Sequence, residues 1–158
     1  MTQVTGAIAQ SVYAVEVSAN ALSWTAVSGA AAAISFSGGD IPVGEQFTAD
    51  GEEAIVTTSN KNGPRDITVR CVYTEGASDA WKTVWDLCTG ATKLMAVRWS
   101  PAGGVATNKR YSTAVGGVAA IVPIVSCTMP EQDSGSGDPL LFEFTVRTPG
   151  IYEETISA

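Results

Sequence analysis

The chain of 158 residues contains no histidine. Histidine-based general acid–base catalysis, the Ser-His-Asp and Cys-His nucleophile pairs and nearly all His-ligated metal sites are therefore excluded. The phosphate-binding patterns G-x-x-x-x-G-K-S/T and G-x-G-x-x-G are also missing. Adjacent Glu52 and Glu53 would point to opposite sides of a strand, so they do not form a glycosidase pair. We expect a protein without enzymatic activity, cofactor or metal.

Charge is scarce as well, because Asp, Glu, Lys and Arg make up only 16% of the chain and the isoelectric point is near 4.4. Such an acidic chain is unsuited to broad attraction for nucleic acid, which requires a basic face. Cys71, Cys88 and Cys127 are an odd set without a C-x-x-C pair, so we expect buried free thiols. The N-terminus lacks signal-peptide features, and the longest apolar run, 118–125, is too short to span a bilayer. We expect folding in a reducing cytoplasm.

The charges that are present fall into blocks. The first 60 residues hold six carboxylates, including Asp50, Glu52 and Glu53, and no Lys or Arg. Residues 87–130 hold no carboxylate but carry four cations, Lys93, Arg98, Lys109 and Arg110. From Glu131 onward the chain is acidic again. Segregated charge attracts its complement on other molecules, so these residues are candidates for contacts between copies of the chain. The alternative is that folding mixes charges that are separated in sequence.

Apolar and polar residues alternate over most of the chain, which predicts strands. Ser78 as N-cap and Gly90 after the end predict a single helix at about 78–89 with an apolar stripe that contains Trp81, Val84 and Trp85. Short connections indicate antiparallel pairing, so the fold class is mainly β: an antiparallel β-sandwich or barrel flanked by one α-helix, in a single domain over 1–158. The predicted strands are 11–17, 21–27, 31–37, 66–74, 93–99, 110–115, 118–129 and 140–148.

Residues 38–64 form a long loop or hairpin that is too apolar for an idle surface segment. Its apolar residues require burial against something, either the chain's own domain or a neighbouring copy. The candidates for such contacts are Ile41, Val43, Phe47 and Ile55. An acidic block and a basic block on one chain would favour head-to-tail contacts, which close into rings or extend as filaments.

Three segments give the sequence a resemblance to a known family. They are the strand-to-helix unit from Gly63 to Trp81, the hairpin from Val97 to Gly104 and the ending from Gly137 to Gly150. With these segments the chain resembles the tail tube proteins, or major tail proteins, of long non-contractile phage tails, most like those of phages of actinobacteria. The likeness covers roughly 63–150 and rests on order and spacing.

The resemblance implies a virion protein, made in the cytoplasm of a bacterial host, that assembles into hexameric rings stacked as a tube. It implies contact with other tail proteins (tape measure, terminator, baseplate or tip) and a long loop that reaches between rings. DNA would be a passenger in an acidic lumen, and no membrane is involved. We take Glu16 and Glu143 as lumen candidates, since each is a carboxylate on a strand face that is otherwise apolar or neutral.

Other interpretations stay open at this point. A tail-terminator or head–tail joining protein would share the sandwich but stop at one ring. A secreted β-sandwich module that binds carbohydrate or cell wall would use exposed tryptophan, for which Trp24 and Trp99 are the candidates. An enzyme that uses carboxylates, a Ser-Lys pair or a lone cysteine is the remaining alternative.

Overall fold

Strict alternation builds the centre of the fold, in a computed structural model that describes residues 5–158. Strands β6 (Arg65–Val72) and β11 (Leu141–Thr148) pair antiparallel over their whole length, from Leu141 opposite Val72 to Thr148 opposite Arg65. Every second side chain of each strand is buried, and the intervening ones face outward. The buried members are Ile67, Val69 and Cys71 in β6 and Phe142, Phe144, Val146 and Thr148 in β11.

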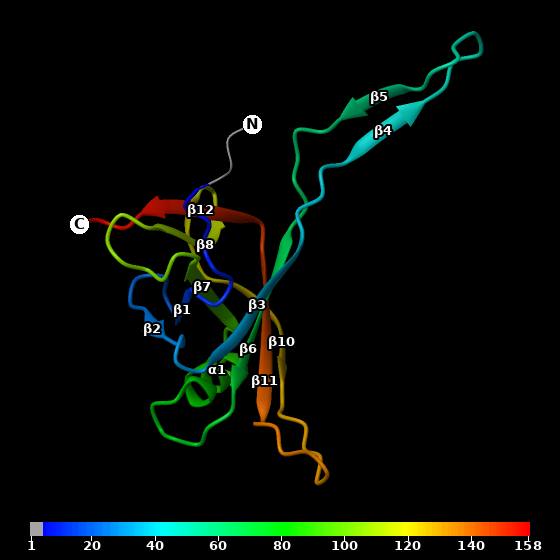
Figure 1. Cartoon of the computed structure of the whole chain (residues 1–158). Helices are drawn as coiled ribbons and strands as arrows, with labels where there is room; N and C mark the ends of the chain where they lie inside the picture. The colour runs from blue at the N-terminus through cyan, green and yellow to red at the C-terminus, as the bar shows by residue number, and fades with distance from the viewer. Residues whose placement is uncertain (1–4) are drawn as a thin grey trace.

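The paired strands belong to an antiparallel sheet that folds over into two facing layers (Figure 1). We call the layer that contains β6 and β11 sheet B; its strand order is β3 (Ala31–Gly38), β6, β11 and β10 (Val122–Thr128). Sheet A consists of β2 (Thr25–Ala26), β1 (Ala14–Ser18), β7 (Leu94–Ser100), β8 (Lys109–Val115) and β12 (Gly150–Thr155), with β9 (Val118–Ala119) beside β8. The layers join where β7 pairs with β10 at Met95 opposite Val122.

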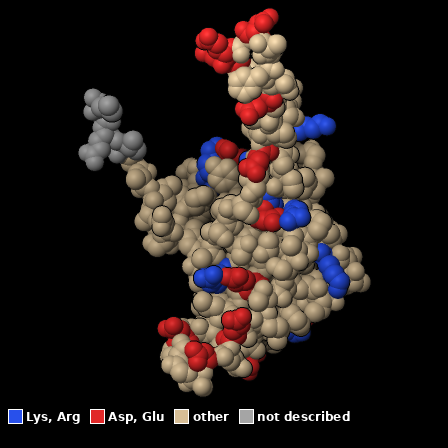
Figure 2. Space-filling model, turned by 90° about the vertical axis from the view of Figure 1, so that its right-hand side faces the viewer, with Lys and Arg blue, Asp and Glu red and all other residues tan. Residues whose placement is uncertain are grey.

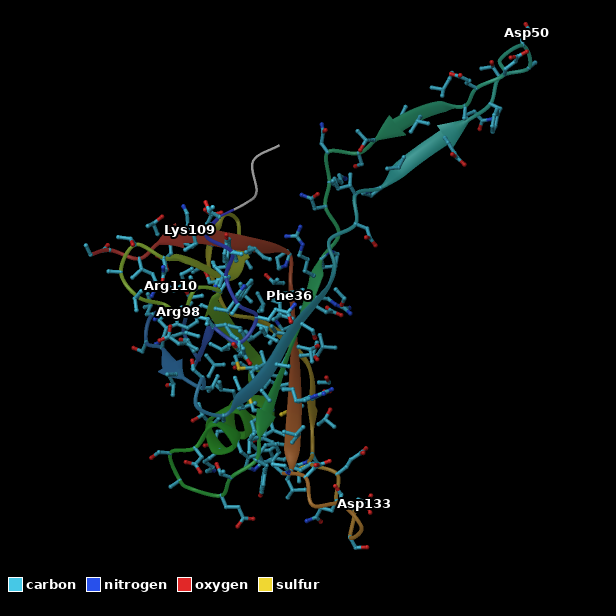
Figure 3. All side chains as sticks on the ribbon, in the orientation of Figure 1. Phe36, Asp50, Arg98, Lys109, Arg110 and Asp133 are labelled. Carbon is cyan, nitrogen blue, oxygen red and sulfur yellow. The ribbon has the colours of Figure 1, made fainter. Side chains whose placement is uncertain are left out.

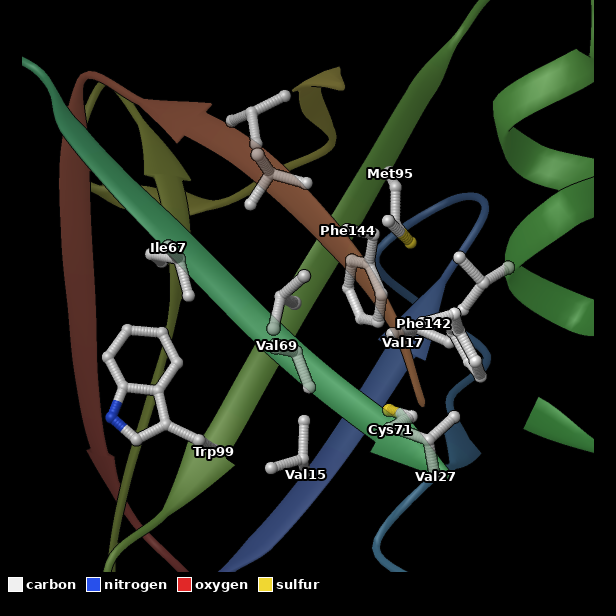
Figure 4. Close-up of a cluster of buried hydrophobic side chains, with 14 residues drawn as sticks. Val15, Val17, Val27, Ile67, Val69, Cys71, Met95, Trp99, Phe142 and Phe144 are labelled. Carbon is white, nitrogen blue, oxygen red and sulfur yellow. The ribbon is translucent and has the colours of Figure 1, made fainter. Parts of the chain in front are cut away.

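The core lies between the two sheets (Figure 4). Sheet A contributes Val15 and Val17 from β1 and Met95, Val97 and Trp99 from β7. Trp99 packs against Phe36 of β3 and Tyr111 of β8, with ring centroids 4.9 and 6.0 Å apart. Since both sheets bury one face in the same cluster, the predicted class is confirmed: a mainly β, antiparallel fold with a single helix in residues 5–158.

Helix α1 (Ala80–Thr89) closes one end of the sandwich, and Gly90 follows it as predicted. Val84 is buried, and the Trp81 ring packs on Phe142 with centroids 5.0 Å apart. The predicted N-cap, Ser78, was wrong by one position, since Asp79 has the extended backbone of the cap. The Asp79 carboxylate accepts the Gly76 N–H at 2.9 Å and so orders the turn before the helix. The side chain of Asp79 thus bonds the chain before the helix and does not cap the first helical N–H groups, and sequence spacing does not distinguish this arrangement from a Ser cap.

Residues 38–64 form a hairpin that projects from the body as an arm (Figure 1). Its strands are β4 (Val43–Gln46) and β5 (Ile55–Thr58), paired from Val43 opposite Thr58 to Gln46 opposite Ile55. The arm continues the direction of β3 and β6, which it connects. The hairpin alternative for this segment is therefore confirmed, and the arm does not fold back on its own body.

Strand β12 is the main element that the sequence patterns failed to predict. It pairs with β8 from Gly150 opposite Ala114 to Thr155 opposite Lys109. The predicted strand at 21–27 is only two residues long, because the loop before it is held by Ser18 and Asn20 side chains. The predicted strand at 118–129 divides into β9 and β10.

Candidate assembly surfaces

The base of the arm requires glycine. Gly38, the last residue of β3, has a φ of +83°, and a Cβ there would lie 2.4 Å from the Pro64 carbonyl oxygen. The next residue, Gly39, also has a positive φ, and its N–H donates to the same Pro64 oxygen at 3.0 Å. Gly63 N–H donates to the Asp40 carbonyl at 2.8 Å on the other side of the base. The outgoing and returning segments of the arm are thus hydrogen-bonded to each other where they leave the sheet, in a conformation that requires glycine.

The large apolar side chains of the arm are more than half exposed in the described chain. Ile41, Val43, Phe47 and Ile55 are 52%, 64%, 62% and 56% exposed. Apolar side chains gathered on a projecting hairpin are typical of a surface that is buried in an assembly. These candidates are accordingly accessible to a neighbouring copy, and their inter-ring contact stays a prediction.

The tip of the arm is acidic, because Asp50, Glu52 and Glu53 are all exposed in the turn between β4 and β5. Figure 3 places Asp50 at the far end of the arm, away from Arg98, Lys109 and Arg110 on the body. The other acidic extremity is the loop between β10 and β11, where Asp133 is labelled. That loop borders an open hollow of about 1070 Å³ lined partly by Glu131, Asp133 and Asp138.

Folding mixes most of the charges that are segregated in sequence. Three cations of the basic block pair within the chain: Arg98 with Glu16, Lys109 with Glu153 at 3.0 Å and Arg110 with Glu154 at 2.7 Å. Arg98 also lies over Trp24, with 4.4 Å between its guanidinium carbon and the ring centroid. Lys93 is the one cation of the block outside these ion pairs, within residues 5–158, and it is exposed. Among the basic candidates, Lys93 is therefore the one best placed for contact with another chain.

The two lumen candidates lie on opposite sides of the sandwich. Glu16 is on the outer face of sheet A, since its neighbours Val15 and Val17 are in the core. Glu143 is on the outer face of sheet B, between buried Phe142 and Phe144. A passage lined by one of these faces can therefore include only one of the two carboxylates.

The outer face of sheet B carries three polar rows that cross from strand to strand. The first joins Ser37, Asp66 and Arg147, the second Ser35, Thr68, Thr145 and Ser126, and the third Ala33, Arg70, Glu143 and Thr128. The Thr68 and Thr145 hydroxyl oxygens are 2.9 Å apart. Figure 2 shows basic and acidic side chains side by side on the body, whereas acidic ones alone gather at the tip of the arm. We call the three rows of residues on the outer side of sheet B the sheet B face.

The thiols of Cys88 and Cys127 meet between α1 and β10, although they are distant in sequence. The hydrogen bond that Cys127 donates lowers the pKa of Cys88, helped by nearby Lys93 and opposed by burial. The same bond raises the pKa of Cys127. Burial raises the pKa of Cys71 to about 12. The expectation of buried thiols is confirmed for Cys71 but wrong for Cys88 and Cys127, which are half-buried.

This arrangement predicts an order of thiol reactivity. With iodoacetamide at about pH 8, Cys88 is expected to react first, well before Cys71 and Cys127, because the thiolate is the nucleophile, and the pKa of Cys88 is lowered whereas those of the other two thiols are raised. Peptide mass spectrometry against time gives the three rates, and urea-unfolded protein is the control in which they converge. Equal rates in the folded protein would contradict the prediction.

The described residues hold no group of three or more Cys, Asp or Glu side chains arranged to bind a metal ion. Residues 5–158 contain no helix with the length and apolar character needed to cross a membrane.

The sequence matches no family model and no curated protein. Solved structures do resemble the chain. The sheath/tube terminator of an extracellular contractile injection system, PVC, aligns with a TM-score of 0.65 and 16% identity over 97% of this chain and 100% of that one. The tube-terminating cap of the anti-feeding prophage aligns at 0.60 and 14% identity, over 98% and 95%. A chain of the anti-feeding prophage baseplate aligns at 0.66 and 10% identity, over 99% and 100%. The chain shares the fold of these proteins over nearly its whole length.

The sequence patterns predicted the arm but not the sheet B face. The arm was detectable because apolar residues are unusual in a long turn-rich segment. The rows of the face depend on strand register between segments such as 65–72 and 141–148, which no local pattern encodes. Glu153 and Glu154, which pair with Lys109 and Arg110, were not predicted as ion-pair partners because strand β12 was not predicted.

Proposed function

We propose that the chain is a non-enzymatic structural virion protein that self-assembles into stacked hexameric rings and forms the tube of a phage tail. In this proposal 1–158 is a single tail-tube domain, and DNA passes through the tube during ejection. The observation that carries the proposal is the projecting arm, whose apolar side chains are more than half exposed in the isolated chain. Such a surface is typical of one that is buried in an assembly, and stacking on another ring would cover it.

Free strand edges support ring closure. Strand β3 pairs only with β6 in the described chain, and β10 pairs with β7 only at Val122 and Pro123. One side of β3 and most of one side of β10 are thus open to another chain, at opposite edges of sheet B. An open edge is a template for strand pairing, and joining β3 of one copy to β10 of the next is a heterologous contact that can close a ring.

Closure through these edges would turn the sheet B face toward a common axis, as the wall of a lumen. Glu143 then lines the passage, and Glu16 lies on the outer side. The acidic tip of the arm, with Asp50, Glu52 and Glu53, is the counterpart that Lys93 of another copy would attract. The tape measure, terminator and baseplate or tip proteins are the further partners that such a tube requires.

A terminator or cap is the second candidate function, because the PVC terminator and the anti-feeding prophage cap share the fold over nearly the whole chain. Likeness to those systems also leaves an extracellular injection apparatus as an alternative to a virion. A carbohydrate-binding module has less support, since Trp99 is buried and Trp24 is partly covered under Arg98.

Electron microscopy of the purified full chain at rising concentration tests the proposal. We expect long tubes with a regular ring repeat. Single rings that never stack would favour the terminator, and a chain that stays monomeric at every concentration would overturn both. Salt is expected to weaken early association. The attraction between Lys93 and the arm tip is largely screened at separations beyond about 10 Å in 0.1 M salt.

A further inference from the structure

The sheet B face contains two arginines, and each is held by a carboxylate directly across the neighbouring strand. The Arg147 Nε donates to Asp66 Oδ1 at 2.7 Å, and a second nitrogen donates to Oδ2 at 3.0 Å. On the same strand pair, Arg70 Nε donates to Glu143 Oε1 at 2.7 Å, and its terminal nitrogen lies 2.6 Å from that oxygen. The register places both pairs opposite each other without a shift. Each guanidinium therefore presents its donors to a carboxylate of its own subunit.

The other side chains of the sheet B face are small and offer only weak interactions to a passing molecule. Its other members are serine and threonine hydroxyls and Ala33, with no aromatic ring and no lysine. Two carboxylates against two arginines leave the face with no net charge. Both arginines are nevertheless accessible, with side chains 52% and 54% exposed, so a passing phosphate could reach them if they were unpaired.

We propose that Asp66 and Glu143 mask Arg147 and Arg70, so that the sheet B face lets a nucleic-acid polyanion slide past without binding it. This inference rests on the proposed function, in which the face lines the passage. The acids act by occupying two of the three nitrogens of each guanidinium and by cancelling its charge, which differs from a lumen that simply repels phosphate. The arginines can then bridge β6 and β11 without becoming phosphate-binding sites.

The test unmasks both arginines in the full chain with Asp66→Asn and Glu143→Gln, which keep the side-chain shapes. We expect binding of a short DNA duplex, measured by fluorescence anisotropy at low salt below the assembly concentration, to tighten about tenfold or more. The slope of log affinity against log salt should steepen by about 1.8, because each phosphate contact contributes about 0.9. Wild-type affinity equal to that of the double variant would overturn the proposal.

A charge-matched control separates masking from net charge. Glu154→Gln with Asp86→Asn frees Arg110 and Lys82 away from the face with the same change in charge. An equal gain in this control would overturn the proposal. The swapped pair Arg70→Glu with Glu143→Arg keeps the face neutral and should bind DNA as weakly as wild type; tight binding would count against masking.

Microscopy of the same proteins keeps the two hypotheses apart. Tubes from wild type without a gain in the unmasked variant would reject masking alone, whereas absence of tubes would reject the proposed function. If the double variant is unfolded by circular dichroism, Glu143→Gln alone carries the test. It is expected to steepen the salt slope by about half as much, and an unchanged slope would overturn the proposal.

Discussion

Replacing Ile41 and Phe47 together with alanine is expected to leave a folded subunit that no longer forms tubes. Both side chains are more than half exposed in the isolated chain, so their truncation removes little that stabilises the subunit. In an assembly that buries them, each would contribute about 1.5–3 kcal/mol. The loss of at least about 3 kcal/mol per subunit raises the concentration required for assembly more than about a hundredfold.

Sedimentation and negative-stain microscopy measure the assembly, and thermal unfolding measures the subunit. The matched control truncates two exposed apolar residues of the body, Leu22→Ala with Val118→Ala, and is expected to assemble like wild type. Tubes at wild-type concentration from the arm variant would contradict inter-ring docking. Loss of folding would instead show that the arm belongs to the core of its own subunit.

Phe144→Ala is expected to lower the free energy of unfolding by about 3–5 kcal/mol. Phe144 is completely buried between the two sheets, where its removal leaves a cavity that the neighbouring strands cannot fill. A typical domain has only about 5–15 kcal/mol of stability, so the variant will be close to unfolding at physiological temperature.

Urea denaturation followed by circular dichroism measures this loss. Phe47→Ala is the matched control, since it makes the same chemical change at a position that is 62% exposed, and it should shift stability by less than about 1 kcal/mol. Losses of similar size in the two variants would contradict the assignment of Phe144 to the core and Phe47 to an external surface.

Local periodicity was enough to predict most of the framework. The alternation in 66–74 and 140–148 and the helical spacing of Trp81, Val84 and Trp85 reproduce β6, β11 and α1 closely. These elements bury one regular face, and a regular face leaves a regular pattern. Strand β12 escaped because its residues are mostly half-buried and its two adjacent acids, Glu153 and Glu154, interrupt the apolar pattern.

Strand pairing could not be predicted from the sequence, and most of the candidate site depends on which strands pair. Glu16 and Arg98 are 82 positions apart and become partners only because β1 lies beside β7. The interpretation of the charge blocks as a contact surface therefore narrows to Lys93 and the tip of the arm. The alternative, in which folding mixes the charges, describes the other three cations of the basic block.

The glycine joint at the base of the arm has a geometric consequence. Gly38 and Gly39 hold two successive left-handed conformations, and the tie to Pro64 fixes the direction in which the arm leaves the sheet. For a tube stacked through its arms, that direction determines how far each ring rotates relative to the one below. The helical pitch of the whole filament would then be encoded in the torsion angles of two glycines at the base of the arm.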